Sequence, residues 1–410
     1  MKLNPIINSL LETDLYKLTM NQMIFHKYTG LCGEYWFKCR NKDVLFTPEM
    51  VDEIKEQVDH LCTLTFKKEE LEWLKTIRFI KSDYVEFLKL WRPLREYVNI
   101  RAIDEQPGLE VIVRGPIFSA MHFEIYLLEI INEVYFRMKY DYNVLLESAR
   151  KKLDEKLYRF NLASKYDYET GLQRYDFKFA EFGARRRLSG EWQDEVVRTL
   201  KENLIAKNCV GTSNLYLAKK YNMTPIGTFA HEYVSMFQGI NSISPAYSNR
   251  YALKEWYDEY QGDLGTALTD TLGTDVFLLD FNRAMANLFT GVRHDSGDPY
   301  VWGEKILEHY KKLGIDAKTK TLLFSDSLDF DKAQELYDYF SGLTNVSFGI
   351  GTFITNDTCV DPLNIVLKLQ YVNDKPVAKL SDNEGKTMSM DSNYVEYLKR
   401  CINWRLTHQK

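Results

Sequence analysis

The second half of the chain contains a series of short apolar runs, each followed directly by polar residues. These are FKFAEF into GARRR, CV into GTSN, TPIGTFA into HE, DVFLLD, LFTGV into RHDSGD, TLLFS into DSLD and VSFGI into GTFITND. Helical stretches such as EKILEHYKKLG and DKAQELYDYF separate several of them. Strands that alternate with helices favour a parallel sheet, and chemistry at the ends of such strands is typical of an α/β barrel. Because the spacing is uneven, we expect an irregular barrel.

The residues before this series follow a different pattern. Residues 1–115 are mixed and rich in charges; GEYWFKCR and GLEVIVRG predict strands, and KKEELEWLKT predicts an exposed helix. In residues 116–136 apolar residues recur at helical spacing, which predicts a long amphipathic helix that begins near Ser119. With 410 residues, the chain is long enough for two domains or for one large domain with extensions.

Charge and composition argue against several classes of protein. A net charge of −5 lacks the basic footprint that nucleic-acid binding needs. The N-terminus carries Glu12 and Asp14 where a signal peptide needs apolar residues, and no apolar run approaches the ~18 residues of a membrane helix. The six cysteines lack metal-ligand spacing and are expected to be thiols. These features predict a cytoplasmic location without nucleic-acid or membrane partners.

His231 and Glu232 stand where the run TPIGTFA ends. In an extended segment, adjacent side chains point to opposite faces, so these two are not expected to form an acid–base pair. The segment TDTLGTD offers Asp270 and Asp275, either of which could hold one ring nitrogen and leave the other as a nucleophile. The alternative is a buried histidine with satisfied hydrogen bonds and no chemistry.

Two arginine-containing segments are candidates for anion binding. In EFGARRR, residues 185–187 can clamp an anion beside the aromatic face of Phe182. In RHDSGD, Arg293 is combined with Asp295 and Asp298, whose carboxylates could hold sugar hydroxyls or Mg²⁺. A solvated helix start and an ordinary turn are the respective alternatives.

Two further strand ends suggest contacts with a phosphosugar. Asp326 in FSDSLD could bind a ribose diol. Gly349 and Gly351, followed by Thr352, could allow backbone N–H groups to cradle a phosphate, although glycines also simply make turns. Together the clusters predict a pocket for an anionic phosphosugar, a planar ligand and Mg²⁺, but they do not identify the reaction.

At these motifs the sequence closely resembles the nicotinate phosphoribosyltransferase family. The family's motifs occur in order over nearly the whole chain: LLETDLYKLTMNQ, FKCRN, EFGARRR, GTSN, GTFAHE, DTLGTD, RHDSGDP and FGIGTFITND. The resemblance implies transfer of a phosphoribosyl group from phosphoribosyl pyrophosphate to nicotinate, which gives nicotinate mononucleotide and pyrophosphate in NAD salvage. It also implies coupling to ATP hydrolysis through a phosphohistidine, with Mg²⁺ as cofactor.

The resemblance further implies a type II phosphoribosyltransferase-like fold. An irregular α/β barrel is expected in residues 126–370. A smaller α/β domain is expected in residues 1–125, joined by C-terminal residues from about 370 to 410.

By position in the motifs, the resemblance implies that His231 is transiently phosphorylated and that Asp270 orients it. It assigns substrate binding to Phe182, Arg185, Thr212, Ser213, Arg293, Asp295, Asp326, Gly349, Gly351 and Thr352. Tyr16 and Arg40 match residues that related enzymes place across a dimer interface, so a homodimer with shared active sites is expected. The ligands of Mg²⁺ are not identified.

Three other functions remain open at this stage. The first is the same chemistry on nicotinamide, against which the three arginines of EFGARRR argue because they suit a substrate carboxylate. The second is a hydrolase with Mg²⁺ on Asp295 and Asp298. The third is a non-catalytic nucleotide sensor. The presence of His231 and of the glycines near the predicted phosphate site argues against it.

Overall fold

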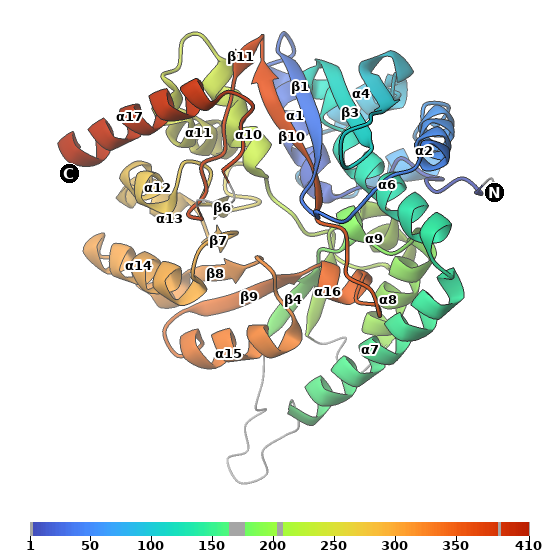
Figure 1. The fold of residues 1–410 in the computed structure, drawn as a ribbon. Helices are drawn as coiled ribbons and strands as arrows, with labels where there is room; N and C mark the ends of the chain where they lie inside the picture. The colour runs from blue at the N-terminus through green and yellow to red at the C-terminus, as the bar shows by residue number, and fades with distance from the viewer. Residues whose placement is uncertain (1–2, 164–176, 203–207, 384–386, 410) are drawn as a thin grey trace.

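The structure is a computed structural model that describes residues 3–163, 177–202, 208–383 and 387–409, and its fold is mixed α/β with two sheets (Figure 1). A five-stranded antiparallel sheet has the order β11-β10-β1-β3-β2, and a six-stranded parallel sheet has the order β5-β4-β9-β8-β7-β6. The strands are β1 (Cys32–Cys39), β2 (Val98–Ala102), β3 (Leu109–Pro116), β4 (Lys178–Glu181), β5 (Cys209–Thr212), β6 (Thr266–Leu268), β7 (Gly291–His294), β8 (Thr321–Phe324), β9 (Asn345–Ile350), β10 (Ile365–Val372) and β11 (Lys375–Pro376).

Helices cover both sheets and link the strands of the parallel one (Figure 1). They are α1 (Leu15–Lys27), α2 (Pro48–Leu61), α3 (Lys68–Leu74), α4 (Ser82–Leu90), α5 (Ile117–Ala120), α6 (Phe123–Lys139), α7 (Tyr142–Ala163), α8 (Gly190–Glu202), α9 (Leu215–Tyr221), α10 (His231–Met236), α11 (Ser248–Tyr260), α12 (Thr274–Asp280), α13 (Arg283–Leu288), α14 (Pro299–Lys312), α15 (Phe330–Phe340), α16 (Thr352–Thr355) and α17 (Ser392–His408).

The antiparallel sheet joins the two ends of the chain. Strand β1 lies between β3, which follows it in the sequence, and β10, which comes more than three hundred residues later. The apolar sequence of β10 is buried at most positions, because helices α6 and α10 pack against it. Each end of the chain thus completes a sheet that the other end cannot form alone.

Most of the predicted strands are confirmed. Those in GEYWFKCR, GLEVIVRG, FKFAEF, CV, LFTGV, TLLFS and VSFGI correspond to β1, β3, β4, β5, β7, β8 and β9. TPIGTFA is not a strand: only Pro225 forms an isolated bridge, to Thr212. Pro225 has no N–H group to donate, so it cannot continue the pairing with β5 as a strand ladder. The backbone φ of +158° at Gly227 does not by itself explain why the pairing stops. The segment crosses the end of β5 as an irregular connection.

The prediction of a strand in DVFLLD is wrong, because this segment forms α12. Its N-terminus is capped from a distance: Asp382, 108 residues later, accepts hydrogen bonds from the N–H of Thr274 at 2.7 Å and from its hydroxyl at 2.6 Å. Such a cap satisfies donors that a helix start leaves free, and no local motif announces it. The strand in this part of the sheet is the three-residue β6, which the sequence analysis did not identify.

The observed helix differs from the predicted amphipathic helix near Ser119 in where it begins and in how completely it is buried. The short α5 precedes it, and α6 begins at Phe123. All residues of α6 from Phe123 to Phe136 are buried, since the helix packs between α2 and the 3-10 helix Ala184–Arg186. Its polar residues therefore have internal partners; Glu133, for example, pairs with Arg137 at 2.8 Å.

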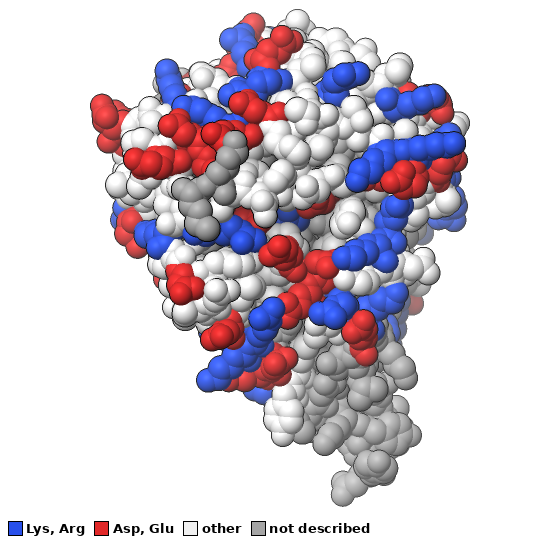
Figure 2. Space-filling view, turned by 90° about the vertical axis from the view of Figure 1, so that its right-hand side faces the viewer, with Lys and Arg blue, Asp and Glu red and all other residues white. Residues whose placement is uncertain are grey.

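The outer surface shows no concentration of one charge on the face in Figure 2, where lysines and arginines alternate with aspartates and glutamates. This mixed pattern agrees with the small net charge of −5. Among the described helices, none has the length and apolar character that crossing a bilayer requires.

The C-terminal helix α17 packs on α12 and on the 3-10 helix Pro245–Tyr247, where Leu398 and Ile402 join a small apolar cluster. A buried ion pair fixes this contact: Arg405 Nη2 lies 2.8 Å from Asp280 Oδ1, and both side chains are almost fully buried.

We predict that Arg405→Met lowers the free energy of unfolding by about 3–5 kcal/mol, because Asp280 is left charged and unpaired in the interior. The matched control is Arg400→Met on the same helix, which removes an exposed pair with Glu396 and should cost no more than about 1 kcal/mol. Chemical denaturation monitored by circular dichroism measures both values. Equal, small losses in the two variants would contradict this role of Arg405.

Candidate active site

A cavity of about 520 Å³ lies between the two sheets. On one side it is lined by residues at the carboxyl ends of β4, β5, β7, β8 and β9, and on the other by residues of α1, α6 and β10 and by the segment after β1. The carboxyl ends of parallel strands meet at one edge of a sheet, which is why motifs far apart in the sequence share this space.

Nearly all the residues predicted for the site line this cavity. They are Tyr16, Arg40, Phe182, Arg185, Ser213, His231, Arg293, Asp295, Asp326, Gly349, Gly351 and Thr352. Asp270 lies behind His231, and Thr212 lies beneath the surface, where its hydroxyl donates to Glu181 Oε2 at 2.5 Å. Thr212 therefore supports the wall of the cavity in this structure, and substrate contact by this residue stays a prediction.

Tyr16 and Arg40 line the cavity of their own chain. Their distance from the other motifs in the sequence therefore needs no neighbouring subunit to explain it, and a site shared between two subunits stays a prediction. Tyr16 is positioned by helix α1, which packs against α11 and α5. Arg40 is positioned by its N–H, which donates to Asn364 O at 2.9 Å. Both residues therefore lie on the side of the cavity that faces the parallel sheet. Within one chain, Tyr16 and Arg40 therefore lie at the same cavity as the motifs of the parallel sheet.

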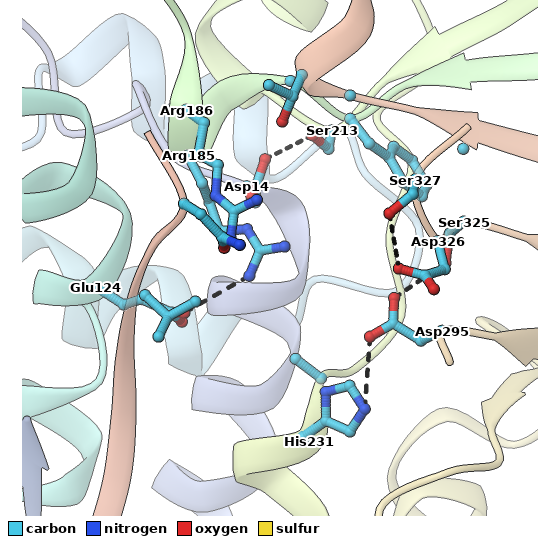
Figure 3. A pocket seen from close by; sticks show the side chains of 18 of the residues that line it. Asp14, Glu124, Arg185, Arg186, Ser213, His231, Asp295, Ser325, Asp326 and Ser327 are labelled. Atoms are coloured by element: carbon cyan, nitrogen blue, oxygen red, sulfur yellow. Dashed lines mark hydrogen bonds and ion pairs between the residues drawn. The ribbon is translucent and has the colours of Figure 1, made fainter. Parts of the chain in front are cut away.

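His231 is the first residue of α10 and is buried in the cavity wall. Its Nε2 atom lies 2.8 Å from Asp270 Oδ1. The same atom lies 3.5 Å from Asp295 Oδ2 (Figure 3). A nitrogen that faces two carboxylates carries the proton, so Nδ1 keeps its lone pair. The prediction that Asp270 holds one ring nitrogen is thus matched by the geometry.

Burial, helped by the nearby Lys379 ammonium, lowers the pKa of His231 to about 4, although Asp270 opposes this shift. Burial also opposes the charge of Asp270, but His231 and Lys379 keep its pKa well below the usual range. The pair is therefore a neutral imidazole on a carboxylate, which is the form in which a histidine can act as a nucleophile.

Two residues that the sequence analysis missed complete the surroundings of Asp270. Its Oδ2 accepts a hydrogen bond from Ser296 at 2.6 Å and lies 3.0 Å from Lys379 Nζ. A further cavity lysine, Lys368, has a pKa lowered to about 8 by burial. Single lysines in a C-terminal segment carry no recognisable motif, so only the fold reveals them.

The arginines of EFGARRR have two different roles. Arg185 and Arg186 line the cavity, on the side opposite His231 and Asp295 (Figure 3). Arg187 points into the core, where it is 1% exposed and pairs with Glu12 and Glu129. The argument from three arginines is corrected to two from this segment, together with Arg40 and Arg293.

Arg186 and Arg293 have guanidinium N–H groups that could bind an anionic ligand. Burial lowers the pKa of Arg186 to about 10, with Arg185 and Arg40 adding to the shift. Within the described part of the chain, its guanidinium donates to two neutral oxygens, Ile365 O and Asn364 Oδ1. Nε of Arg293 is buried without a hydrogen-bond partner among the described residues. This side of the cavity therefore favours a negatively charged ligand.

Two candidate carboxylates lie outside the site. Asp275 is largely exposed and pairs with Lys305 at 2.8 Å. Asp298 is the N-cap of α14 and accepts hydrogen bonds from the N–H groups of Tyr300 and Val301. We therefore assign both residues structural roles in place of roles in the site: Asp275 forms an ion pair at the surface, and Asp298 caps a helix.

Phe182 explains in part why Gly349, near the end of β9, and Gly351, just after it, are glycines. A Cβ atom on Gly349 would come within 2.4 Å of the Phe182 ring, and one on Gly351 within 2.8 Å of Phe182 O. Gly349 thus lets the Phe182 ring, which lines the cavity, approach the strand closely. Only Gly351, the N-cap of the short α16, stands where backbone N–H groups could face a phosphate.

Carboxylates on one wall could hold a divalent cation. Ligand atoms of His231, Asp270 and Asp295 lie within 4.8 Å of one another, but Lys379 already balances this group. Asp295 and Asp326 reach the cavity beside the hydroxyls of Ser325 and Ser327 (Figure 3). Such an all-oxygen wall fits Mg²⁺ better than the histidine group does.

Comparison with known proteins gives consistent matches. The model of the nicotinate phosphoribosyltransferase (NAPRTase) family matches residues 177–405, and that of the NAPRTase N-terminal domain matches residues 11–132. The chain is 46% identical over 404 residues to a nicotinate phosphoribosyltransferase of Acinetobacter baylyi, and 46% identical over 401 residues to one of Chromobacterium violaceum, with 98% of each chain covered in both cases.

Solved structures agree with these sequence matches. The crystal structure of nicotinate phosphoribosyltransferase from Vibrio cholerae superposes with a TM-score of 0.91 at 36% identity, covering 98% of this chain and 96% of the other. That of a putative nicotinate phosphoribosyltransferase from Saccharomyces cerevisiae gives a TM-score of 0.87 at 32% identity, covering 98% and 100%.

We predict that His231 stays neutral, with its proton on Nε2, between pH 5 and pH 8. Because its pKa of about 4 lies below the ordinary 6.5, protonation favours the unfolded chain, and the stability that His231 contributes is lost as the pH falls from about 6.5 towards 4. Nitrogen-15 NMR of labelled histidine, assigned with His231→Gln, reports the tautomer and the midpoint. A midpoint near 6.5, or a proton on Nδ1, would contradict this geometry.

Proposed function

The chain belongs to the nicotinate phosphoribosyltransferase family, and from this premise we propose that its cavity couples ATP hydrolysis to phosphoribosyl transfer through phosphate carried on His231. The activity itself is that of a nicotinate phosphoribosyltransferase, a step of NAD salvage. One observation supports the coupling most directly: a neutral, carboxylate-held histidine lies in a cavity that several arginines also line.

The sugar transfer does not need a protein nucleophile. The ring nitrogen of nicotinate forms a bond to the anomeric carbon of phosphoribosyl pyrophosphate, and the bond from that carbon to pyrophosphate breaks, with its electron pair leaving on pyrophosphate. The transition state is cation-like, so it needs a held base and charge stabilisation. Phe182 offers the planar face for the base, and Asp295 and Asp326 offer negative charge.

His231 is free for a second reaction. Its Nδ1 lone pair attacks the γ-phosphorus of ATP, the bond to the bridging oxygen breaks, and ADP leaves. The proton on Nε2 stays on the carboxylate side, where Asp270 compensates the charge that develops on the ring. Water later cleaves the N–P bond. The phosphoryl group adds about −1.5 to −2 charges, by which it can change the affinity for anionic substrates.

Mg²⁺ fits this assignment, because Asp295 and Asp326 present carboxylate oxygens at the cavity wall. An ion held by these carboxylates would supply neutralisation of phosphate charge. Lys379 Nζ lies 3.0 Å from Asp270 Oδ2 and 3.9 Å from Asp295 Oδ2, so it compensates Asp270 more closely and leaves Asp295 the better candidate for the cation.

Finer points of architecture are also proposals. The parallel sheet, whose strand ends carry the site, is proposed as an irregular barrel, with an N-terminal domain that the C-terminal strands complete. A homodimer is compatible with this arrangement. Tyr16 and Arg40 line the cavity of their own chain, and whether they also reach a partner's site is a matter for the oligomeric state in solution.

The rival functions differ in what the cavity must contain. A nicotinamide-specific enzyme has no use for an excess of arginines, and a hydrolase with Mg²⁺ on Asp298 loses that ligand to the cap of α14. A nucleotide sensor is separated by a single assay, since only an enzyme releases pyrophosphate in a manner that depends on nicotinate.

We predict that nicotinate is used far better than nicotinamide. A charged contact from Arg185 or Arg293 to the substrate carboxylate is worth about 1.5–3 kcal/mol, which corresponds to roughly ten- to 150-fold in kcat/KM. Pyrophosphate release with each substrate measures this ratio. Similar values for the two would show that these arginines do not contact the base.

We predict that γ-labelled ATP phosphorylates the protein in an acid-labile, base-stable linkage. His231→Asn should abolish labelling and ATP hydrolysis but leave a slow, ATP-independent transfer, because the groups that stabilise the sugar cation remain. Asp270→Asn should slow labelling without removing the acceptor. Normal labelling of His231→Asn, with the phosphate on another residue, would refute the assignment of His231.

A further inference from the structure

A buried lysine ties three helices together beneath the cavity. Lys17 of α1 is fully buried, and its Nζ lies 2.5 Å from Glu124 Oε2 of α6. The same nitrogen makes a very close ion pair with Glu232 Oε1 of α10. Burial opposes its charge, but the two carboxylates raise the pKa of Lys17. Buried charges are stable only with close partners, so these three side chains fix one another's positions.

Glu232 itself lines the cavity, Lys17 lies behind it, and each of the two is adjacent in sequence to another residue that faces the cavity. Tyr16 precedes Lys17, and His231 precedes Glu232. Successive residues of a helix are about 100° apart, so the two residues of each pair are held on adjoining faces of one turn. The ion pair between Lys17 and Glu232 therefore sets the distance and angle between their neighbours Tyr16 and His231.

Glu124 extends this arrangement to the anion-binding side. Its Oε1 lies 3.8 Å from Arg185 Nη1 and 4.0 Å from Lys368 Nζ, and both of these residues line the cavity. Although burial opposes its charge, Lys17, Lys368 and Arg185 lower the pKa of Glu124 to about 2. One buried lysine thus connects the histidine to the cations opposite it.

We infer that Lys17 and Glu232 are positioning residues for phosphoryl transfer, because their ion pair holds the His231 ring at a fixed place relative to Tyr16, Arg185 and Lys368. The inference rests on the proposed phosphorylation of His231 and adds the device that aligns it. Neither Lys17 nor Glu232 exchanges a proton or a bond with substrate in this role.

The test is the single-turnover rate of phosphorylation per folded molecule. Glu232→Gln keeps the length of the side chain and removes its charge; Glu232→Asp keeps the charge and shortens the reach. Because displacement of a reacting group by about 1 Å can cost 10²-fold, we expect both variants to slow labelling by roughly ten- to a hundredfold. A purely structural role would lower the melting temperature and leave the rate per folded molecule unchanged.

The matched control is Glu255→Gln. Glu255 of α11 pairs with Lys27 of α1 at 2.7 Å, so this pair also joins α1 to a neighbouring helix, but it does not line the cavity. The control should label at the wild-type rate. If Glu232→Gln fails to fold, Glu232→Asp supplies the same measurement without an uncompensated lysine.

The outcomes separate this inference from the proposed function. A wild-type protein that is never labelled refutes the phosphohistidine, and the positioning role with it. A wild-type protein that is labelled normally, with a Glu232 variant that is labelled as fast, refutes the positioning role alone. Slow labelling of both Glu232 variants, with a normal rate in Glu255→Gln, establishes it.

Discussion

The pairing of β1 with β10 is the interaction on which the rest of the molecule depends. It joins residues 33–39 to residues 365–372 in an antiparallel ladder, and it places Arg40 and Lys368 on the same side of the cavity. Without it the carboxyl ends of the parallel strands would open to solvent. Water would then screen the charges that the chemistry uses and compete for the phosphate groups.

Charge compensation is the second constraint. The cavity brings together more ionisable groups than a protein interior tolerates unless each has a partner. Asp270 is held by His231, Ser296 and Lys379, and Glu124 by Lys17, Arg185 and Lys368. Among the described residues, Arg186 and Arg293 keep hydrogen-bonding capacity, since the Arg186 guanidinium donates to neutral oxygens and Nε of Arg293 has no hydrogen-bond partner. Both arginines line the cavity where anionic substrates are expected, and Arg186 lies across it from the neutral histidine (Figure 3).

The same arrangement explains why residue types alone are a poor guide to roles. Arg185 and Arg187 belong to one tripeptide, yet one faces the cavity and the other neutralises buried glutamates. Asp295 and Asp298 belong to one motif, yet Asp298 caps a helix. Gly349 resembles part of a phosphate loop, but the space beside it is filled by the ring of Phe182. In each case the direction of the side chain, and not its chemistry, decides the role.

The sequence by itself determined the alternation of strands and helices and the motifs around His231, Asp270 and Arg293, because these are encoded in local periodicity and in short contiguous segments. It predicted five of the six strands of the parallel sheet, and β1 and β3 of the antiparallel one. It could not identify α12, whose cap is Asp382, or the three-residue β6, because the stabilising partners are remote. Only the tertiary structure revealed Lys379, Lys368 and the Lys17–Glu232 pair, and only it returned Tyr16 and Arg40 to their own chain's cavity. These contacts join residues that lie far apart in the sequence, and such contacts arise from packing and not from local pattern.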